Sequence, residues 1–322
     1  RRQRQMCIRD RYDLEIERQM PLVPRFLRWP VRERTGPKGQ EWTALDEGSV
    51  RALLPKLKAE KIESVAIGFL HSYANPANER RAAEILSAAQ PDLSISLSSE
   101  VCPEVREYER LSTTSANAYV RPLMSSYLLA LEAALKSIGV TCPLLLMMSS
   151  GGVTTLTTGI KFPIRLIDSG PAGGAILARD IAAIFGANNA LSFDMGGTTA
   201  KICLIDDGLA QTSRGFEVAR AYRHRRGSGL PIRIPVVEMV EIGAGGGSIA
   251  TVDNMRRINV GPDSAGAEPG PACYGIGGQS ATVTDADVLL GRIDPEFFAG
   301  GMVKLFPEKA SEAIARNVGT LL

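Results

Sequence analysis

The segment from Ala190 to Gly208 most constrains how this chain can fold, because two short apolar runs flank a pair of glycines. The first run ends in Asp194, and the chain turns at Gly196 and Gly197 before the second run begins. Glycine adopts positive φ angles at little cost, so this pattern predicts a β-hairpin. A hairpin with an exposed polar tip is the simplest interpretation of the segment taken alone.

The polar residues of this hairpin indicate more than a turn. Asp194 stands at the end of the first strand, and Thr198 and Thr199 follow the two glycines. Glycine amides can approach an anion closely, hydroxyl groups can donate to it, and a carboxylate can hold a hydrated cation. The set therefore suits a phosphate group with its Mg²⁺.

Composition excludes several classes of protein. The chain has 322 residues, of which 44% are hydrophobic and 22% charged, as expected for a globular protein of about two domains. A net charge of +2 gives no support for nucleic acid or an acidic membrane as a partner. No apolar run has the length of a membrane span, so no membrane association is expected.

The cysteines and histidines restrict the chemistry further. Five cysteines are scattered without CxxC spacing, and the two histidines are His71 and His224. This usage argues against a zinc site or a disulfide framework and predicts a reducing, cytoplasmic location. Cys273 could be a nucleophile, but no base is identifiable nearby, so a buried thiol is the favoured interpretation.

The first half of the chain predicts an α/β fold. Residues 1–11 differ in character from the rest of the chain and are interpreted as a non-native head, and the basic stretch 220–226 as a solvated loop. A strand over 64–70, a helix after Asn75 and Pro76, and a strand over 93–97 predict a parallel or mixed sheet. Two further predictions are a short edge strand over 28–32 and a helix capped by Asp46 and broken near Pro55.

The middle of the chain predicts long helical and buried strand segments. A helix starting at Ser112 or Thr113 and ending at Gly139 contains Pro122, so one helix and two helices joined at a kink are both open. Residues 143–148 predict a buried strand, with the small polar loop 149–152 at its carboxyl edge. The charged side chains just before the helix predict a surface ion-pair cluster of Glu104, Arg106, Glu107, Glu109 and Arg110.

Three more glycine-rich segments follow strands or open helices. The first opens the helix 175–185 and is an anion-site candidate, although close helix packing is the favoured interpretation of its glycines. The second, over 245–250, matches GxGxxA, but residues 251–260 predict extended chain where a dinucleotide fold needs a long helix. The third, Gly261 to Gly278, is too rich in glycine and proline for regular structure, and Thr284 or Asp285 then caps a helix over 286–290.

No P-loop and no Ser/His/Asp triad is found, which leaves the glycine-rich segments as the main chemical signal. Several independent segments offer the same kind of backbone edge. Together they favour nucleotide or phosphate binding.

The chain resembles the hydantoinase A / 5-oxoprolinase family, which includes N-methylhydantoinase A-like proteins and acetone and acetophenone carboxylase subunits. The resemblance runs from about residue 14 to the end, and its most specific part is the loop 261–278. The other matching segments are Glu104 to Arg110, Ser112 to Thr114, Asn117 to Tyr119, Ser169 to Gly174, Phe193 to Thr199, Gly243 to Ala250, Thr282 to Arg292 and Phe298 to Gly301. It implies an α/β, actin-like (ribonuclease H-like) two-lobed ATPase fold, with the family's N-terminal region ending within 12–111 and its ATPase region over 112–322.

The resemblance also implies a function and its site. ATP would phosphorylate the amide oxygen of a cyclic amide such as hydantoin, N-methylhydantoin or 5-oxoproline, and water would then attack the activated carbon. Asp194 would hold Mg²⁺ as the catalytic residue. The implied cofactor-binding residues are Gly196, Gly197, Thr198, Thr199, Ser169, Gly170, Gly173, Gly174, Gly245, Gly246 and Gly247.

One departure from the family concerns its second phosphate hairpin. Family members begin with another Asp–Gly–Gly–Thr hairpin, and nothing before residue 100 resembles it here. We therefore expect an internal fragment of a larger chain, with an incomplete first lobe and no activity alone. The expected partner is a hydantoinase B-type subunit or a second copy in a homo-oligomer. A ketone carboxylase subunit and a non-catalytic nucleotide-binding module are the alternatives. Thr199-Ala200-Lys201, where many relatives carry Ser/Thr-Thr-Asp, points weakly to the hydantoin-type branch.

Overall fold

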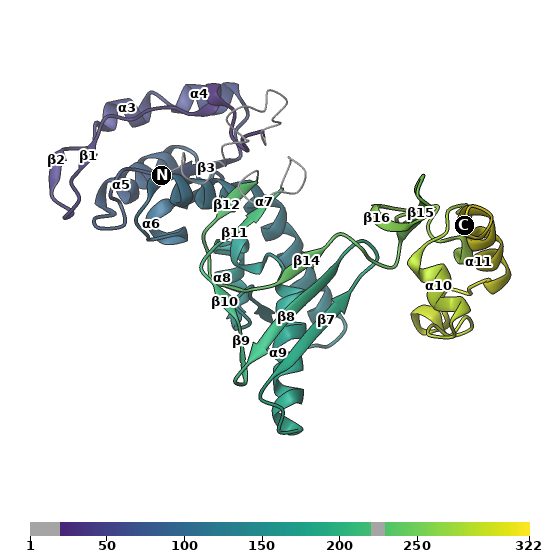
Figure 1. Cartoon of the computed structure of the whole chain (residues 1–322). Helices are drawn as coiled ribbons and strands as arrows, with labels where there is room; N and C mark the ends of the chain where they lie inside the picture. Colours follow the sequence, from purple (N-terminus) through teal and green to yellow (C-terminus); the bar gives the residue numbers. More distant parts are fainter. Residues whose placement is uncertain (1–19, 220–228) are drawn as a thin grey trace. The chain divides into compact units, whose positions relative to one another are not determined.

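The computed structural model of the protein describes residues 20–219 and 229–322 (Figure 1). The predicted head over 1–11 and the basic stretch 220–226, including His224, lie outside the described residues. In the described part, no helix is long and apolar enough to cross a membrane.

The chain divides into two compact units, and neither is a single continuous stretch. The first unit combines Arg1–Gly173 with Thr212–Val237, and the second combines Gly174–Gln211 with Glu238–Leu322. Helix α9 (Ser169–Ile184) begins in the first unit and ends in the second. The domain boundaries expected from the sequence stay a prediction.

The first unit contains the predicted β–α–β arrangement. Strands β3 (Ser64–Ile67) and β4 (Ser94–Leu97) pair in parallel, with helix α5 (Ala77–Ala89) between them in the chain. This confirms the α/β prediction for this part of the sequence. The apolar core of the arrangement consists of Val50, Leu57, Ile67, Ala82, Ile85, Leu86, Leu93 and Leu97.

The segment before β3 confirms one prediction and contradicts another. Asp46 caps α3 (Glu47–Arg51) by accepting a hydrogen bond from the Ser49 amide, and the helix breaks before α4 (Leu54–Ala59), as predicted near Pro55. The predicted edge strand over 28–32 is wrong, since Pro30 cannot donate to a ladder and that segment follows the short helix η1 (Arg25–Leu27) without regular structure. The strands in this region are β1 (Arg34–Thr35) and β2 (Glu41–Thr43).

A single long helix, α7 (Glu107–Ser137), runs through the first unit and contains Pro122 without a break. It begins five residues earlier than predicted, because the two acidic residues of its first turn stabilise a helix N-terminus. Gly139 follows its C-terminus as predicted, with a φ of 89° that favours glycine.

A buried polar network links α7 to the β–α–β arrangement. Arg110 is only 1% exposed and donates to the Ser98 hydroxyl (3.2 Å) and to the backbone carbonyls of Phe69 (3.0 Å) and Glu104 (2.8 Å). Glu79 is fully buried and accepts from the Ser98 hydroxyl (2.6 Å) and the Phe69 amide (3.0 Å). We call Glu79, Ser98 and Arg110 the Arg110 network. Its burial corrects the prediction that Arg110 belongs to a surface ion-pair cluster.

The predicted buried strand over 143–148 is the short strand β5 (Leu145–Met147), and it is only partly covered. It pairs antiparallel with β6 (Val153–Thr155), so the loop 149–152 is a hairpin turn. The prediction that this loop lies at the carboxyl edge of a parallel sheet is therefore wrong. The remaining elements of the unit are α6 (Ser98–Val101), α8 (Leu156–Lys161), η2 (Pro163–Leu166), β10 (Thr212–Ser213), β11 (Phe216–Val218), β12 (Leu230–Ile232) and β13 (Val236–Val237).

The second unit contains a small antiparallel sheet built around the predicted hairpin. Strand β8 (Ala200–Asp206) lies between β7 (Ala190–Met195) and β14 (Val240–Ile242), and it also pairs with β9 (Leu209–Ala210) (Figure 1). A second hairpin follows, formed by β15 (Ser248–Val252) and β16 (Ile258–Ser264). This extended chain over 251–260 confirms that the GxGxxA match does not open a dinucleotide-binding helix.

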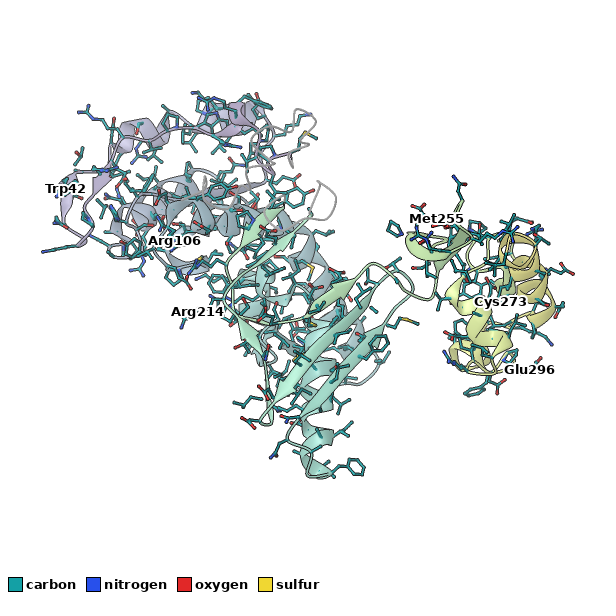
Figure 2. The ribbon with its side chains drawn as sticks, in the orientation of Figure 1. Trp42, Arg106, Arg214, Met255, Cys273 and Glu296 are labelled. Carbon is teal, nitrogen blue, oxygen red and sulfur yellow. The ribbon has the colours of Figure 1, made fainter. Side chains whose placement is uncertain are left out.

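The C-terminal part of the second unit has a core of its own, formed by Cys273, Val288, Leu305 and Ala310. Cys273, labelled in Figure 2, is fully buried. The elements around this core are η3 (Ala272–Tyr274), α10 (Val283–Leu289), η4 (Phe298–Gly301), α11 (Pro307–Ile314) and the π-helical η5 (Ala315–Gly319).

Candidate functional site

The predicted hairpin is present, and its turn is the centre of the candidate site. Met195 pairs with Ala200, so the four residues from Gly196 to Thr199 make the turn. The Gly196 amide donates to the Thr199 carbonyl at 2.9 Å and closes it. We call residues 194–199 the Asp194 turn.

A glycine-rich loop from the predicted set lies directly against the Asp194 turn. The amides of Gly246 and Gly247 donate to the carbonyls of Gly196 (2.9 Å) and Gly197 (2.6 Å). A Cβ atom on Gly245 would stand 2.6 Å from the Gly196 carbonyl oxygen, and one on Gly247 would stand 2.9 Å from that of Gly197. Only glycine permits this approach, so the loop supports the turn through backbone contacts. We call Gly245 to Gly247 the supporting loop.

The same contacts define what the supporting loop offers a ligand. The Gly245 amide donates to the Ser248 hydroxyl at 2.8 Å, and the next two amides donate to the turn. The backbone donors of Gly245, Gly246 and Gly247 are thus engaged inside the unit. In this structure the three glycines hold the turn in place.

Unlike the amides of the supporting loop, the polar side chains of the Asp194 turn are not engaged by other described residues. Asp194 and Thr198 are exposed and Thr199 is half-buried. Among the described residues, none forms a hydrogen bond or ion pair with the Asp194 carboxylate or with the two threonine hydroxyls. The amides of Gly197 and Thr198 likewise have no backbone acceptor in the described part of the chain. The turn therefore presents free donors and a carboxylate on a fixed backbone.

The residues that anchor the supporting loop are absent from the site predicted by sequence. The Thr284 amide donates to the Gly246 carbonyl at 2.8 Å, which ties the loop to the start of α10. The helix is capped by Thr282, two residues before the predicted cap, in a capping box with Asp285. The Thr-x-x-Asp spacing over 282–285 is a recognisable signal for this cap.

Asp285 also fixes the glycine- and proline-rich loop that ends at Gly278. Its carboxylate is fully buried and accepts from the amides of Cys273 (2.7 Å), Ala272 (3.3 Å) and Thr282 (2.9 Å), and from the Thr282 hydroxyl (2.8 Å). Burial, together with the Asp285 carboxylate, raises the pKa of the Cys273 thiol to about 12. The thiol stays protonated at neutral pH, which confirms the prediction of a buried thiol over that of a nucleophile.

The predicted anion site at the start of α9 has a different setting. The helix begins at Ser169, so Gly170, Gly173 and Gly174 lie in its first two turns. Added Cβ atoms on Gly170 and Gly174 would meet nothing within 4 Å, so close packing does not explain these glycines. Ser169, Gly170 and Gly173 belong to the first unit, whereas the Asp194 turn belongs to the second.

The described residues contain no group of three histidine, cysteine or acidic side chains that could hold a metal ion. A carboxylate such as Asp194 can nevertheless bind Mg²⁺ in company with water and substrate phosphates, because Mg²⁺ usually keeps several non-protein ligands. Asp194 is exposed and has no partner among the described residues, and it shares its turn with the amides of Gly197 and Thr198, which fits that arrangement.

Comparison with protein families gives two matches. Residues 110–321 match the family described as Hydantoinase/oxoprolinase, and residues 1–89 match the Hydantoinase/oxoprolinase N-terminal region.

Individual relatives agree with the family matches. The alpha subunit of caprolactamase from Pseudomonas jessenii is 37% identical over 96% of this chain and 43% of its own length. The 5-oxoprolinase of Saccharomyces cerevisiae is 38% identical over 86% of this chain and 20% of its own length. A nucleotide-free structure of acetone carboxylase, an ATP-dependent enzyme, superposes with a TM-score of 0.74 at 31% identity, covering 97% of this chain and 43% of that chain. The chain thus spans less than half the length of the relatives it matches.

Proposed function

This chain belongs to the hydantoinase/oxoprolinase family, and from that membership we propose that it supplies part of the nucleotide site of an ATP-dependent cyclic amidohydrolase. The proposed substrate is a cyclic amide of the hydantoin, N-methylhydantoin or 5-oxoproline class. The observation that carries the proposal is the Asp194 turn, whose polar groups have no partner in residues 20–219 and 229–322 and stand on a backbone fixed by the supporting loop. The actin-like fold and a cytoplasmic location are part of the proposal.

Each group of the turn has a role that its chemistry suits. The amides of Gly197 and Thr198 and the hydroxyls of Thr198 and Thr199 would donate to phosphate oxygens. Asp194 would hold Mg²⁺ through its hydration shell. Gly245, Gly246 and Gly247 would keep these donors in position.

ATP as a substrate would transfer its γ-phosphoryl group to the amide oxygen and leave as ADP, which would activate the amide carbon towards water. Water would add to that carbon, the ring C–N bond would break with the nitrogen leaving as a protonated amine, and a second water would release phosphate from the resulting acyl phosphate. The turn would contribute by neutralising and orienting the phosphates. The rest of a larger chain would complete the active site, and a B-type subunit or a second copy of the chain would be its partner, in keeping with the subunit names of several relatives.

The carboxylase branch of the family is the second candidate function. The likeness to acetone carboxylase supports it, since that structure superposes as well as the structure of the ATP-dependent caprolactamase from Pseudomonas jessenii, each with a TM-score of 0.74. Such an enzyme would consume bicarbonate and a ketone in place of a cyclic amide. Product analysis with labelled bicarbonate distinguishes the two activities.

The test is amide-dependent ADP release by the complete protein that contains this chain. We expect Asp194→Ala to abolish the release, because the phosphates would lose their cation site. Asp206→Ala is the matched control, since Asp206 is an exposed carboxylate at the far end of the same hairpin. Undiminished ADP release in Asp194→Ala would remove Asp194 from the mechanism.

The non-catalytic alternative is tested on the 322-residue chain itself, which we expect to be inactive. Saturable MgATP binding without ADP release would support a binding module. Turnover by this chain alone would rule that module out.

A further inference from the structure

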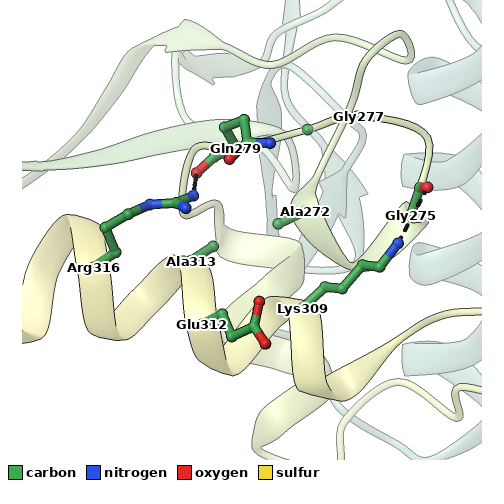
Figure 3. A pocket seen from close by; sticks show the side chains of 9 residues that line it. Ala272, Gly275, Gly277, Gln279, Lys309, Glu312, Ala313 and Arg316 are labelled. Carbon is green, nitrogen blue, oxygen red and sulfur yellow. Dashed lines mark hydrogen bonds between the residues drawn. The ribbon is translucent and has the colours of Figure 1, made fainter.

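A small pocket lies in the C-terminal part of the second unit, outside the Asp194 turn and its supporting loop. It has a volume of about 230 Å³ and lies between α11 with η5 on one side and the loop Gly275 to Gln279 on the other (Figure 3). The small buried side chains of Ala272 and Ala313 leave this space open.

One wall of the pocket carries three charged side chains at helical spacing. Lys309, Glu312 and Arg316 are three and four residues apart, so they lie along one face of the helix. Figure 3 shows Glu312 between the two cations. None of the three forms an ion pair with another described residue, although their spacing would allow pairs within the helix.

The two cations are held over the two ends of the loop. Lys309 donates to the Gly275 carbonyl at 3.3 Å, and Arg316 donates to the Gln279 carbonyl at 2.7 Å. Arg316 follows Lys309 by seven positions, which corresponds to a rise of about 10 Å at the α-helical spacing. A ligand that contacts both therefore needs an acidic group at each end.

The opposite wall is a loop with a fixed backbone. Gly277 has a φ of 115°, which side chains rarely permit, and a Cβ on Gly278 would stand 2.2 Å from the Gly270 carbonyl oxygen. The hydrogen bonds that Asp285 accepts from the Cys273 and Ala272 amides hold η3, which directly precedes this loop. The pocket is thus formed before any ligand binds, which lowers the entropic cost of binding.

We propose that this pocket binds a small amino dicarboxylic acid of the glutamate type. Its two carboxylates would contact Lys309 and Arg316, and its ammonium group would contact Glu312. A dicarboxylate without an amine would meet repulsion from Glu312, whereas glutamate satisfies all three charges. Ring opening of 5-oxoproline yields glutamate, so the pocket would bind a product of the reaction. Only this identification of glutamate as a product rests on the proposed function.

The test is isothermal titration calorimetry of the purified protein with L-glutamate and with glutarate, which lacks only the amine. We expect glutamate to bind at one site, at least tenfold more tightly than glutarate, because only glutamate has an ammonium group that can pair with the Glu312 carboxylate. In Glu312→Gln the preference for glutamate over glutarate should disappear, and Arg316→Gln should weaken the binding of both ligands. Glu308→Gln, an exposed change on the same helix, should leave both affinities unchanged.

Equal affinity for the two ligands, a preference that survives Glu312→Gln, or no binding of glutamate would each overturn the proposal. The titration needs neither ATP nor a cyclic amide. Its outcome is therefore independent of whether Asp194→Ala abolishes ADP release.

Discussion

The Arg110 network and the Asp194 turn place polar side chains in opposite surroundings. In the network the side chains are buried, and their hydrogen bonds hold the backbone at Phe69 and Glu104. In the turn the backbone is held by a neighbouring loop, and the side chains are left unpaired by the described residues. The difference indicates that the network maintains the fold, whereas the turn is available to a ligand. Substitutions should therefore separate stability from binding.

The largest effect is expected in the network. Arg110→Met removes three hydrogen bonds from buried groups and should lower the free energy of unfolding by about 3–5 kcal/mol. Urea denaturation measures the change. Arg106→Met, the same substitution at an exposed position nearby, should change it by less than about 0.5 kcal/mol. Equal effects of the two variants would contradict the structural role of the network.

A smaller effect is expected where the supporting loop meets the turn. In Gly245→Ala the new methyl group would lie 2.6 Å from the Gly196 carbonyl oxygen, so one backbone must shift. We expect a loss of about 1–3 kcal/mol in stability together with weaker MgATP binding. Gly243→Ala is the control, because nothing lies within 4 Å of its added Cβ. The same MgATP affinity in both variants would show that the loop does not position the turn.

The buried thiols of Cys102 and Cys273 should make the stability of the protein depend on pH in the alkaline range. Burial raises the pKa of the Cys102 thiol to about 11, and burial together with the Asp285 carboxylate raises the pKa of the Cys273 thiol to about 12. Both thiols therefore ionise more readily in the unfolded chain than in the folded one. Stability from these thiols is complete below about pH 9 and is lost as pH rises through about 11 to 12. Urea denaturation should show the decline, and Cys273→Ala should reduce its slope.

Exposed and buried thiols should also differ in their reactivity towards a labelling reagent. Cys142 is exposed, so an aromatic disulfide reagent should label it at neutral pH while Cys273 reacts only on unfolding. Rapid labelling of Cys273 in the native protein would show that its loop opens.

The smallest effect on stability is expected at Asp194. Its carboxylate has no partner among the described residues, so Asp194→Asn should alter the free energy of unfolding by less than about 0.5 kcal/mol while MgATP binding is lost. Thermal unfolding with and without MgATP measures both quantities. A strong destabilisation without ligand would place Asp194 with the structural residues.

The sequence predicted the features that depend on neighbouring residues. The hairpin around Asp194, the parallel pair over 64–97 and the extended chain after residue 250 all follow from apolar periodicity and glycine position. Each is present in the structure.

Features that depend on distant partners were missed or wrong. The charges around Arg110 resemble an exposed cluster, and its burial depends on carbonyls at Phe69 and Glu104 and on Ser98. The prediction that the loop over 149–152 lies at a ligand-binding carboxyl edge is wrong because nothing local in the sequence reveals that β5 pairs antiparallel with β6. Asp285 likewise gains its role from amides at residues 272 and 273.

The interleaving of the two units has a consequence for how such a protein can be divided genetically. The chain passes from one unit to the other after Gly173, after Gln211 and after Val237, three times in all. No single stop codon or gene fission can release either unit by itself, because residues 1–237 hold the whole first unit but also carry 174–211, and residues 174–322 hold the whole second unit but also carry 212–237. A version of either unit free of the other would need an artificial linker in place of the excised segment.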